Sequence, residues 1–352
     1  MTDGDPAPTR RAFLSWSAAL ATLGCAGSPT ALPVRRGDLH VHLFGTGDRG
    51  SGCVLGPSIR RSATFALLVR LLGLRQDEGF DDGYVRCLLD AVASSGLDVV
   101  ALVGQDGVYD SAGHLDLGRT HWLVPADHLF AVCARHPDVL RSCPSINPQR
   151  RDALDELERC VALGAGLIKI HPPTQDVDIA APRHAPFFRR CADLDVIVLV
   201  HTGHEHSAPV TDIRLADPSR LLPALDAGCR VVACHAGSGR PDDEPDFLPS
   251  FLAMLRRHPR LYGDTSILGT PGRERDLRRL LDDGFARTRL VHGSDFPFPA
   301  IPAGFRAELG SRRVATLNAE RNLLARDRML KDALGLEPSI ALAAALLDGA
   351  MP

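Results

Sequence analysis

The sequence lacks several features that would assign it to a particular class of protein. No apolar run reaches the roughly eighteen residues that a membrane-spanning helix needs. A net charge of −3 offers no basic surface for nucleic acid. The nine cysteines include no Cys-x-x-Cys pair, which argues against a thiolate metal site and favours small buried side chains over a disulfide framework. What is present is a chain of 352 residues, of which 45% are hydrophobic, enough for one large α/β domain or two smaller ones.

The first 33 residues differ from the rest of the chain. Thr9-Arg10-Arg11-Ala12-Phe13-Leu14, followed by a short segment of small residues, resembles a twin-arginine export signal. The junction Gly24-Cys25 resembles a lipoprotein cleavage site with Cys25 as the acylated residue. We therefore expect residues 1–33 to be an export signal and linker, and residues 34–352 to be the folded domain of a periplasmic or otherwise exported protein, with lipid anchoring at Cys25 as a variant of this reading. The alternative is a disordered tail on a cytoplasmic enzyme.

From residue 38 onward, apolar strand patterns alternate with helix patterns. The predicted strands cover residues 38–42, 97–104, 139–146, 166–171, 196–201, 230–235, 261–264 and 289–295. The predicted helices cover residues 57–74, 84–95, 125–135, 150–163, 185–193, 218–227, 247–258 and 273–285, with two more at 314–334 and 340–347. This alternation predicts a parallel sheet, and eight units match a closed (β/α)8 TIM barrel with the additional C-terminal helices packed outside it. An open doubly wound sheet is the alternative, but no G-x-G-x-x-G turn opens a helix here.

The predicted strands end in side chains that bind metals or titrate. Seven of them close five of the strands: His40, His42, Lys169, His171, His201, His235 and Asp295. His40 and His42 lie two residues apart on one strand, so both imidazoles point to the same face. Because the carboxyl ends of barrel strands meet at one mouth, where active sites of this fold lie, we expect these side chains to converge. Imidazole and carboxylate are common ligands of zinc.

These motifs resemble the amidohydrolase superfamily over most of the stretch from Asp38 to Pro299. The resemblance rests on Asp-Leu-His40-Val-His42, Ile-Lys169-Ile-His171-Pro, Val-His201-Thr-Gly, Cys-His235-Ala-Gly and His292-Gly-Ser-Asp295-Phe-Pro. The last of these is similar to the branch that contains aminocarboxymuconate-semialdehyde decarboxylase and its hydrolase relatives. The resemblance implies that a divalent ion, with zinc expected, is bound by four residues: His40, His42, His201 and Asp295. It also implies that His235 is a catalytic acid or base, or a ligand of a second ion.

The number of metal ions depends on Lys169. In two-metal members of the superfamily a lysine at this position is carboxylated and bridges both ions, whereas in single-metal relatives it only lines the pocket. Carboxylation needs a neutral amine held near the metals, which the sequence does not show. We expect one ion, with a second ion at Lys169 and His235 as the alternative.

The expected chemistry follows from the ligand set. A divalent ion lowers the pKa of bound water from about 15.7 towards 7. Asp295 can accept a proton from this water and pass it to the leaving group, and His235 can polarise the carbonyl oxygen. Four residues are candidates for substrate contact: His171, Lys169, Arg240 and His204. Arg240 suits a carboxylate, and Asp264 either orients a metal ligand or caps the next turn.

These observations predict a metal-dependent hydrolase of an amide, lactone or ester bond in a small organic molecule. Non-oxidative decarboxylation of a carboxylic acid on the same site is the alternative reaction. A metal-bearing barrel that only binds its ligand is the alternative outside enzymology. The identity of the substrate and the oligomeric state, a homo-oligomer included, are left open by the sequence.

Overall fold

Eight parallel strands form the centre of the protein in a computed structural model that describes residues 34–76 and 79–349. One sheet has the order β1-β3-β5, and the other has the order β10-β9-β8-β7-β6. Their bounds are β1 (Gly37–His42), β3 (Val99–Val103), β5 (Leu140–Cys143), β6 (Leu167–Ile170), β7 (Ile197–His201), β8 (Arg230–Cys234), β9 (Leu261–Asp264) and β10 (Leu290–Val291). Each of the eight lies within, or begins one residue before, a predicted strand.

Two isolated parallel bridges join the sheets into a closed barrel. Val41 of β1 pairs with Phe296, just after β10, and Ser145, just after β5, pairs with Lys169 of β6. Backbone hydrogen bonds support both seams, including Asp295 N to His40 O at 2.9 Å and Lys169 N to Pro144 O at 2.8 Å. The prediction of a (β/α)8 barrel is therefore confirmed. The first seam also determines the site, because it fixes Asp295 beside β1.

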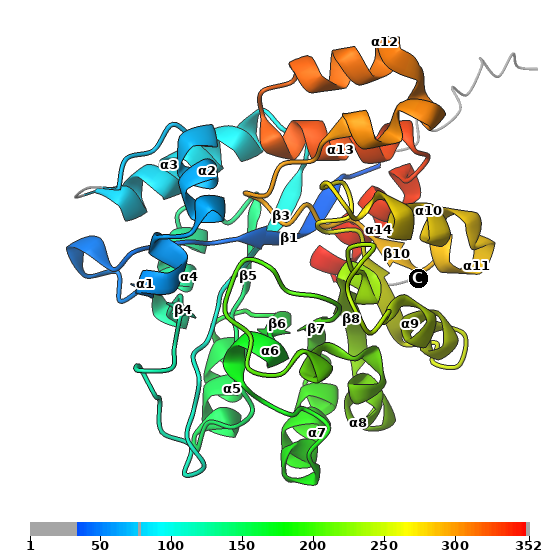
Figure 1. Ribbon diagram of the computed structural model, residues 1–352. Helices are drawn as coiled ribbons and strands as arrows, with labels where there is room; N and C mark the ends of the chain where they lie inside the picture. Colours follow the sequence, from blue (N-terminus) through cyan, green and yellow to red (C-terminus); the bar gives the residue numbers. More distant parts are fainter. Residues whose placement is uncertain (1–33, 77–78, 350–352) are drawn as a thin grey trace, which may run out of the picture. The chain divides into compact units, whose positions relative to one another are not determined.

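The helices cover the outside of the strands (Figure 1). Their bounds are α1 (Pro57–Arg60), α2 (Ala63–Leu71), α3 (Phe80–Ala93), α4 (Ala126–Cys133), α5 (Ala153–Ala162), α6 (Pro172–Gln175), α7 (Ala185–Asp193), α8 (Leu222–Asp226), α9 (Leu248–Leu255), α10 (Glu274–Asp282), α11 (Gly284–Arg287), α12 (Arg306–Ala319), α13 (Leu323–Ala333) and α14 (Glu337–Leu347). The predicted helix 57–74 is broken into α1 and α2 because the Ser62 side chain accepts a hydrogen bond from Phe65 N and starts a new helix. Asp283 caps α11 in the same way and separates it from α10.

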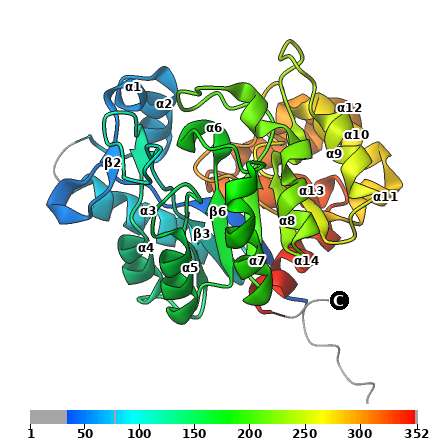
Figure 2. The same ribbon diagram turned by 90° about the horizontal axis from the view of Figure 1, so that it is seen from below.

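The last helix does not pack outside the barrel as predicted. Ala343, Ala344, Leu346 and Leu347 of α14 share a core with inward-facing residues of the strands. A side chain at Gly37, where β1 begins, would come within 2.4 Å of Ala344 N, so glycine permits this close approach. Helix α14 therefore closes the end of the barrel where the strands begin, and Figure 2 shows it at the opposite end of the strands from α6. The other end is left open for a site.

A small antiparallel pair was not predicted. Strand β2 (Val54–Leu55) pairs with β4 (Trp122–Leu123). Two-residue strands are too short to give a period in the sequence. The pair ties the segment after β1 to the segment after β3 and brings Trp122 beside His42, with ring centroids 4.9 Å apart.

None of the helices in the described residues is long and apolar enough to cross a membrane. The predicted export signal and Cys25 lie in residues 1–33, outside the described residues.

Candidate metal centre and active site

Three side chains, two from β1 and one from the segment after β10, form a tight group at the open mouth of the barrel. His42 Nε2 lies 3.1 Å from Asp295 Oδ1, and His40 Nε2 lies 3.4 Å from the same oxygen. All three residues are buried. Asp295 has a φ of 64°, a left-handed conformation that costs a non-glycine residue about 1–3 kcal/mol and is found most often at functional sites. This strained backbone conformation directs the carboxylate towards the two imidazoles.

The donor atoms have the spacing that a metal ion requires. In a tetrahedral site with ligand distances of about 2.0–2.1 Å, neighbouring donor atoms lie about 3.3 Å apart. The two distances to Asp295 Oδ1, 3.1 and 3.4 Å, bracket this value. Two imidazoles and a carboxylate also form a donor set that zinc accepts. The residues present therefore fit a divalent ion.

Asp264 at the end of β9 orients this group. It is completely buried, and its Oδ2 accepts a hydrogen bond from His40 Nδ1 at 2.8 Å. A carboxylate can only accept, so the proton of the neutral imidazole lies on Nδ1 and the lone pair of His40 Nε2 faces Asp295. Of the two roles that the sequence left open for Asp264, the structure favours that of orienting a metal ligand, although Asp264 also accepts from Ser266 N at 3.1 Å in the following turn.

A second chain of hydrogen bonds runs from Asp264 to His201. The Ser266 hydroxyl donates to Asp264, and His235 Nδ1 lies 2.8 Å from Ser266 Oγ and 3.3 Å from the backbone oxygen of Ser266. Because a backbone oxygen only accepts, His235 Nδ1 carries the proton. His235 Nε2 then accepts from His201 Nδ1 at 3.1 Å, and His201 Nε2 is left buried without a hydrogen-bond partner. This lone pair is available to a ligand.

His201 lies beside the three-residue group rather than within it. Its ring centroid is 4.7 Å from that of His235, which is itself 5.3 Å from His40. Its free Nε2 suits the predicted role of fourth ligand, but His201 has its donor atom within 4.8 Å of those of His171 and Glu205, whereas His40, His42 and Asp295 form a separate group of that size. The role of His201 as a ligand therefore stays a prediction.

His171 pairs with a residue for which the sequence suggested no role. His171 Nε2 lies 3.2 Å from Glu205 Oε2, and the His171 ring stacks on His201 at 4.0 Å. Glu205 follows β7 in the loop, where it also accepts hydrogen bonds from Ser207 and Ala208 N. It stands four residues after His201, so a carboxylate near the histidines was visible in the sequence, but the path of the loop was not.

Lys169 is buried next to the group of His40, His42 and Asp295. Its Nζ donates to His40 Nε2 at 3.1 Å and to Cys234 Sγ at 3.0 Å. Neither Lys169 nor His171 lines the cleft described below, so the structure gives no support to direct substrate contact by either residue. Lys169 instead occupies a position next to a metal-ligand atom.

Burial determines the charge of the site. It lowers the pKa of His40 to about 3, with the nearby Lys169 charge acting in the same direction, and it lowers the pKa of His171 to about 4. Burial also lowers the pKa values of His201 and His235. For Asp295 burial acts to raise the pKa, but the hydrogen bond to His42 and the neighbouring histidines hold that pKa below its usual range. Neutral imidazoles beside a charged carboxylate are the state that binds metal.

An open cleft, whose empty space is about 990 Å³ with the solvent at its mouth included, leads to the group. Its walls include Asp295, His201, His235 and three residues proposed or found near them: His204, Arg240 and Arg273. The His204 ring lies with Nε2 2.9 Å from Pro245 O, and Arg240 is exposed at the rim. Arg273, which the sequence did not suggest, is buried and donates to Ser238 O and His204 O. Because Glu205 and Asp295 line the same cleft as the two arginines, the cleft presents groups of both charges to a ligand.

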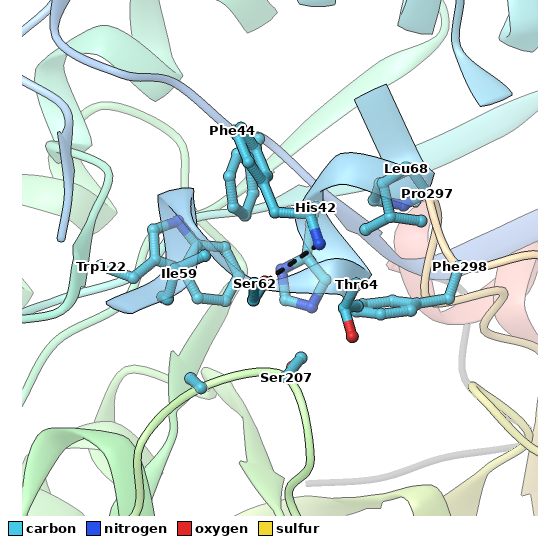
Figure 3. A pocket seen from close by; sticks show the side chains of 12 residues that line it. His42, Phe44, Ile59, Ser62, Thr64, Leu68, Trp122, Ser207, Pro297 and Phe298 are labelled. Carbon is cyan, nitrogen blue, oxygen red and sulfur yellow. Dashed lines mark hydrogen bonds between the residues drawn. The ribbon is translucent and has the colours of Figure 1, made fainter. Parts of the chain in front are cut away.

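A smaller apolar chamber adjoins the cleft on the side of His42 (Figure 3). Its empty space, with the solvent at its open side included, is about 430 Å³, and its walls include Phe44, Ile59, Phe65, Leu68, Trp122 and Phe298. These residues come from the end of β1, from α1 and α2, from β4 and from the loop after β10. His42 lines the chamber and Asp295 lines the cleft, so the metal group lies where the two spaces meet.

Comparison with known proteins agrees with the barrel fold. The sequence model of the amidohydrolase family matches residues 70–328. The chain is similar to the structure of an uncharacterized TIM-barrel protein from Bordetella bronchiseptica, with 17% identity and a TM-score of 0.56 over 86% of this chain and 99% of that one. It is also similar to 5-carboxyvanillate decarboxylase from Sphingomonas paucimobilis, with 13% identity and a TM-score of 0.51 over 89% and 98%.

Likeness at these identities shows the fold. No curated protein matches the chain. The family match spans more than half of the sequence and includes β3, β5 to β10 and the residues that follow them, among them His201, His235, Asp264 and Asp295. The chain therefore belongs to the amidohydrolase family of enzymes.

Proposed function

We propose that this protein is a metal-dependent hydrolase that cleaves an amide, lactone or ester bond in a small organic molecule. The observation that supports this most is the convergence of His40 Nε2, His42 Nε2 and Asp295 Oδ1 at 3.1–3.4 Å, beside an open cleft. These three residues would hold the ion, with His201 as the fourth ligand. When bound, the ion would supply a Lewis acid that makes water a nucleophile at neutral pH and polarises a carbonyl group.

The chain's own groups handle the proton. Asp295 is ionised at neutral pH because the neighbouring histidines hold its pKa below its usual range, so its carboxylate can take a proton from the attacking water and deliver it to the leaving group. His235 Nε2 accepts a hydrogen bond from His201 in the resting state. This tautomer favours His235 as a proton acceptor rather than as the donor to a carbonyl oxygen that the sequence suggested.

We propose a single ion, with zinc as its identity. Lys169 Nζ contacts His40 and Cys234 rather than His201 or His235 among the described contacts, so it lies beside one ligand of the first ion and not between two sets of ligands. A bridging carboxylated lysine would instead bring His235 into a second site. The measured number of ions per chain separates these two arrangements.

Non-oxidative decarboxylation on the same site is the second candidate. Arg240 and Arg273 line the cleft that leads to Asp295, which suits a carboxylate ligand. One of the proteins with a similar fold is a carboxyvanillate decarboxylase. In this reaction the site would manage a proton on carbon rather than attack a carbonyl.

The experiment is a turnover assay with the metal-reconstituted protein on two panels, one of esters, lactones and amides and one of carboxylic acids with trapping of carbon dioxide. Hydrolysis that is abolished in His40→Ala and Asp295→Asn supports the proposal, and gas release without hydrolysis selects the second candidate. No turnover on either panel with the metal bound would favour a binding protein and contradict both.

Export remains part of the proposal, because residues 1–33 carry its only signal. Cell fractionation of the full chain and of an Arg10→Lys/Arg11→Lys variant tests it. Periplasmic activity that depends on the arginine pair is the expected result, and equal amounts of both proteins in the cytoplasm would contradict it.

A further inference from the structure

We propose that the apolar chamber beside His42 binds an uncharged hydrocarbon group of the substrate, a branched alkyl or unsubstituted phenyl group, next to the reacting carbon. This inference rests on the proposed function and specifies the substrate class of the same site. The chamber could not be predicted from the sequence, because it is built from segments that follow four different barrel strands, β1, β3, β7 and β10.

The walls of the chamber are aromatic and aliphatic. Phe44 lies between Trp122 and Phe65, with ring centroids 5.0 and 5.9 Å away, and Ile59 and Leu68 are buried against it. Figure 3 shows Phe44, Ile59, Leu68 and Trp122 around the ring of His42. No Asp, Glu, Lys or Arg is among the described residues that line it. A charged group placed there would lose its hydration without gaining a partner.

Three residues with hydroxyl groups line the chamber, Ser62, Thr64 and Ser207, and two of these hydroxyl groups bond within the protein. Ser62 Oγ accepts the hydrogen bond from Phe65 N that starts α2, at 3.1 Å, and the Ser207 hydroxyl donates to Glu205. A ligand carrying hydroxyl or carboxylate groups on this side would therefore find few partners. A hydrocarbon group needs none.

The chamber is continuous with the site. Three residues line both the chamber and the open cleft: Thr64, Ser207 and Phe298. The contact between His42 and Asp295, at 3.1 Å, lies on the boundary. A substrate whose reacting carbon sits at this boundary would direct its hydrocarbon group into the chamber and its polar group towards Arg240 and Arg273 in the cleft. This arrangement gives the substrate one apolar and one polar side.

Binding can be read without turnover because the sequence contains two tryptophans, Trp16 and Trp122. In a Trp16→Phe background, the fluorescence of Trp122 reports on the chamber. The probes are acetate, propanoate, 3-methylbutanoate and phenylacetate, with succinate and 4-hydroxyphenylacetate as polar counterparts of similar size. Each methylene buried should tighten binding about three- to fourfold, so phenylacetate should bind at least tenfold more tightly than acetate, and more tightly than its hydroxylated counterpart.

Two variants and a matched control connect the effect to the chamber. Leu68→Gln places a polar group on its wall and should weaken phenylacetate binding about tenfold or more, whereas Leu71→Gln changes an exposed residue of the same helix and should leave binding unchanged. Ile59→Phe fills the space and should reverse the preference between phenylacetate and propanoate, which keeps the test valid if Leu68→Gln does not fold.

Equal affinity for acetate and phenylacetate, or tighter binding of succinate, would overturn the inference. So would variants at Leu68 and Ile59 that bind like the parent protein. Failure of the proposed function is a different result: a graded fluorescence series with no turnover leaves the chamber in place and rejects the hydrolase, whereas turnover with a flat series rejects only the chamber.

Discussion

We expect Asp264 to control the metal affinity of the proposed site by orienting His40, and the variant Asp264→Asn tests this role. The substitution keeps the size of the side chain and one acceptor oxygen. That oxygen can still accept from His235 N, now at 2.7 Å, and from Ser266 N at 3.1 Å. The amide nitrogen would then face His40 Nδ1 where Oδ2 now accepts at 2.8 Å. Two donors cannot face each other, so His40 must move its proton to Nε2, the atom that faces Asp295.

The expected loss follows from this change of tautomer. Removing the partner that orients a metal-binding histidine costs about 10- to 100-fold in metal affinity, or about 1.4–2.7 kcal/mol. We expect the dissociation constant for zinc, measured by competition with a chromophoric chelator, to rise by this factor. The retained hydrogen bonds should keep the fold, which a thermal melt of the metal-free protein checks.

A matched control separates orientation from the loss of a buried charge. Asp81 is also a buried aspartate, and it accepts hydrogen bonds from Thr46 N at 2.6 Å and Gly47 N at 3.1 Å, outside the metal group. Asp81→Asn should leave zinc affinity unchanged. Equal zinc affinity in Asp264→Asn and the parent protein, or an equal loss of affinity in both variants, would show that Asp264 does not act by orienting His40.

Three further predictions concern neighbouring groups. Lys331 and Asp327 form a buried ion pair at 2.6 Å, so Lys331→Met should lower the free energy of unfolding, measured in urea, by about 3–5 kcal/mol. The double variant Lys331→Met/Asp327→Leu should recover most of this loss. An equal loss of stability in both variants would contradict the prediction. Lys169→Met should leave one metal equivalent in place, because the single-ion arrangement does not use the lysine, and loss of one of two equivalents by metal analysis would contradict it. Ser266→Ala removes the hydroxyl that links His235 to Asp264 and should reduce kcat more than zinc affinity, with the opposite order as the contradicting result.

The barrel could be predicted from the sequence because its signal is local. Buried parallel strands appear as short apolar runs, and residues such as Val99 to Val103 are apolar without interruption and fully buried. Helix boundaries were less certain because single side chains set them: Ser62 and Asp283 each begin a new helix inside a segment that looks continuous. The position of α14 was wrong because an apolar helix at the end of a chain can cover a wall or an end of the barrel, and only Gly37 reveals which.

The site could be predicted in part for a related reason. Strand ends meet at one mouth, so the sequence was sufficient to place His40, His42 and Asp295 together. Residues on loops escaped prediction because their positions depend on the path of the chain: Glu205 folds back onto His171, and Arg273 reaches under His204. The tautomers of His235 and His201 could not be predicted either, because their proton positions depend on acceptors that only the folded protein brings near.

Metal analysis of the purified protein beside His42→Ala and Asp295→Asn decides whether these side chains form a metal centre. We expect about one equivalent of zinc in the parent protein and a large loss in both variants, with the fold retained. A folded parent protein that binds no divalent ion, or variants that hold it as tightly as the parent, would contradict the claim that these side chains form a metal centre.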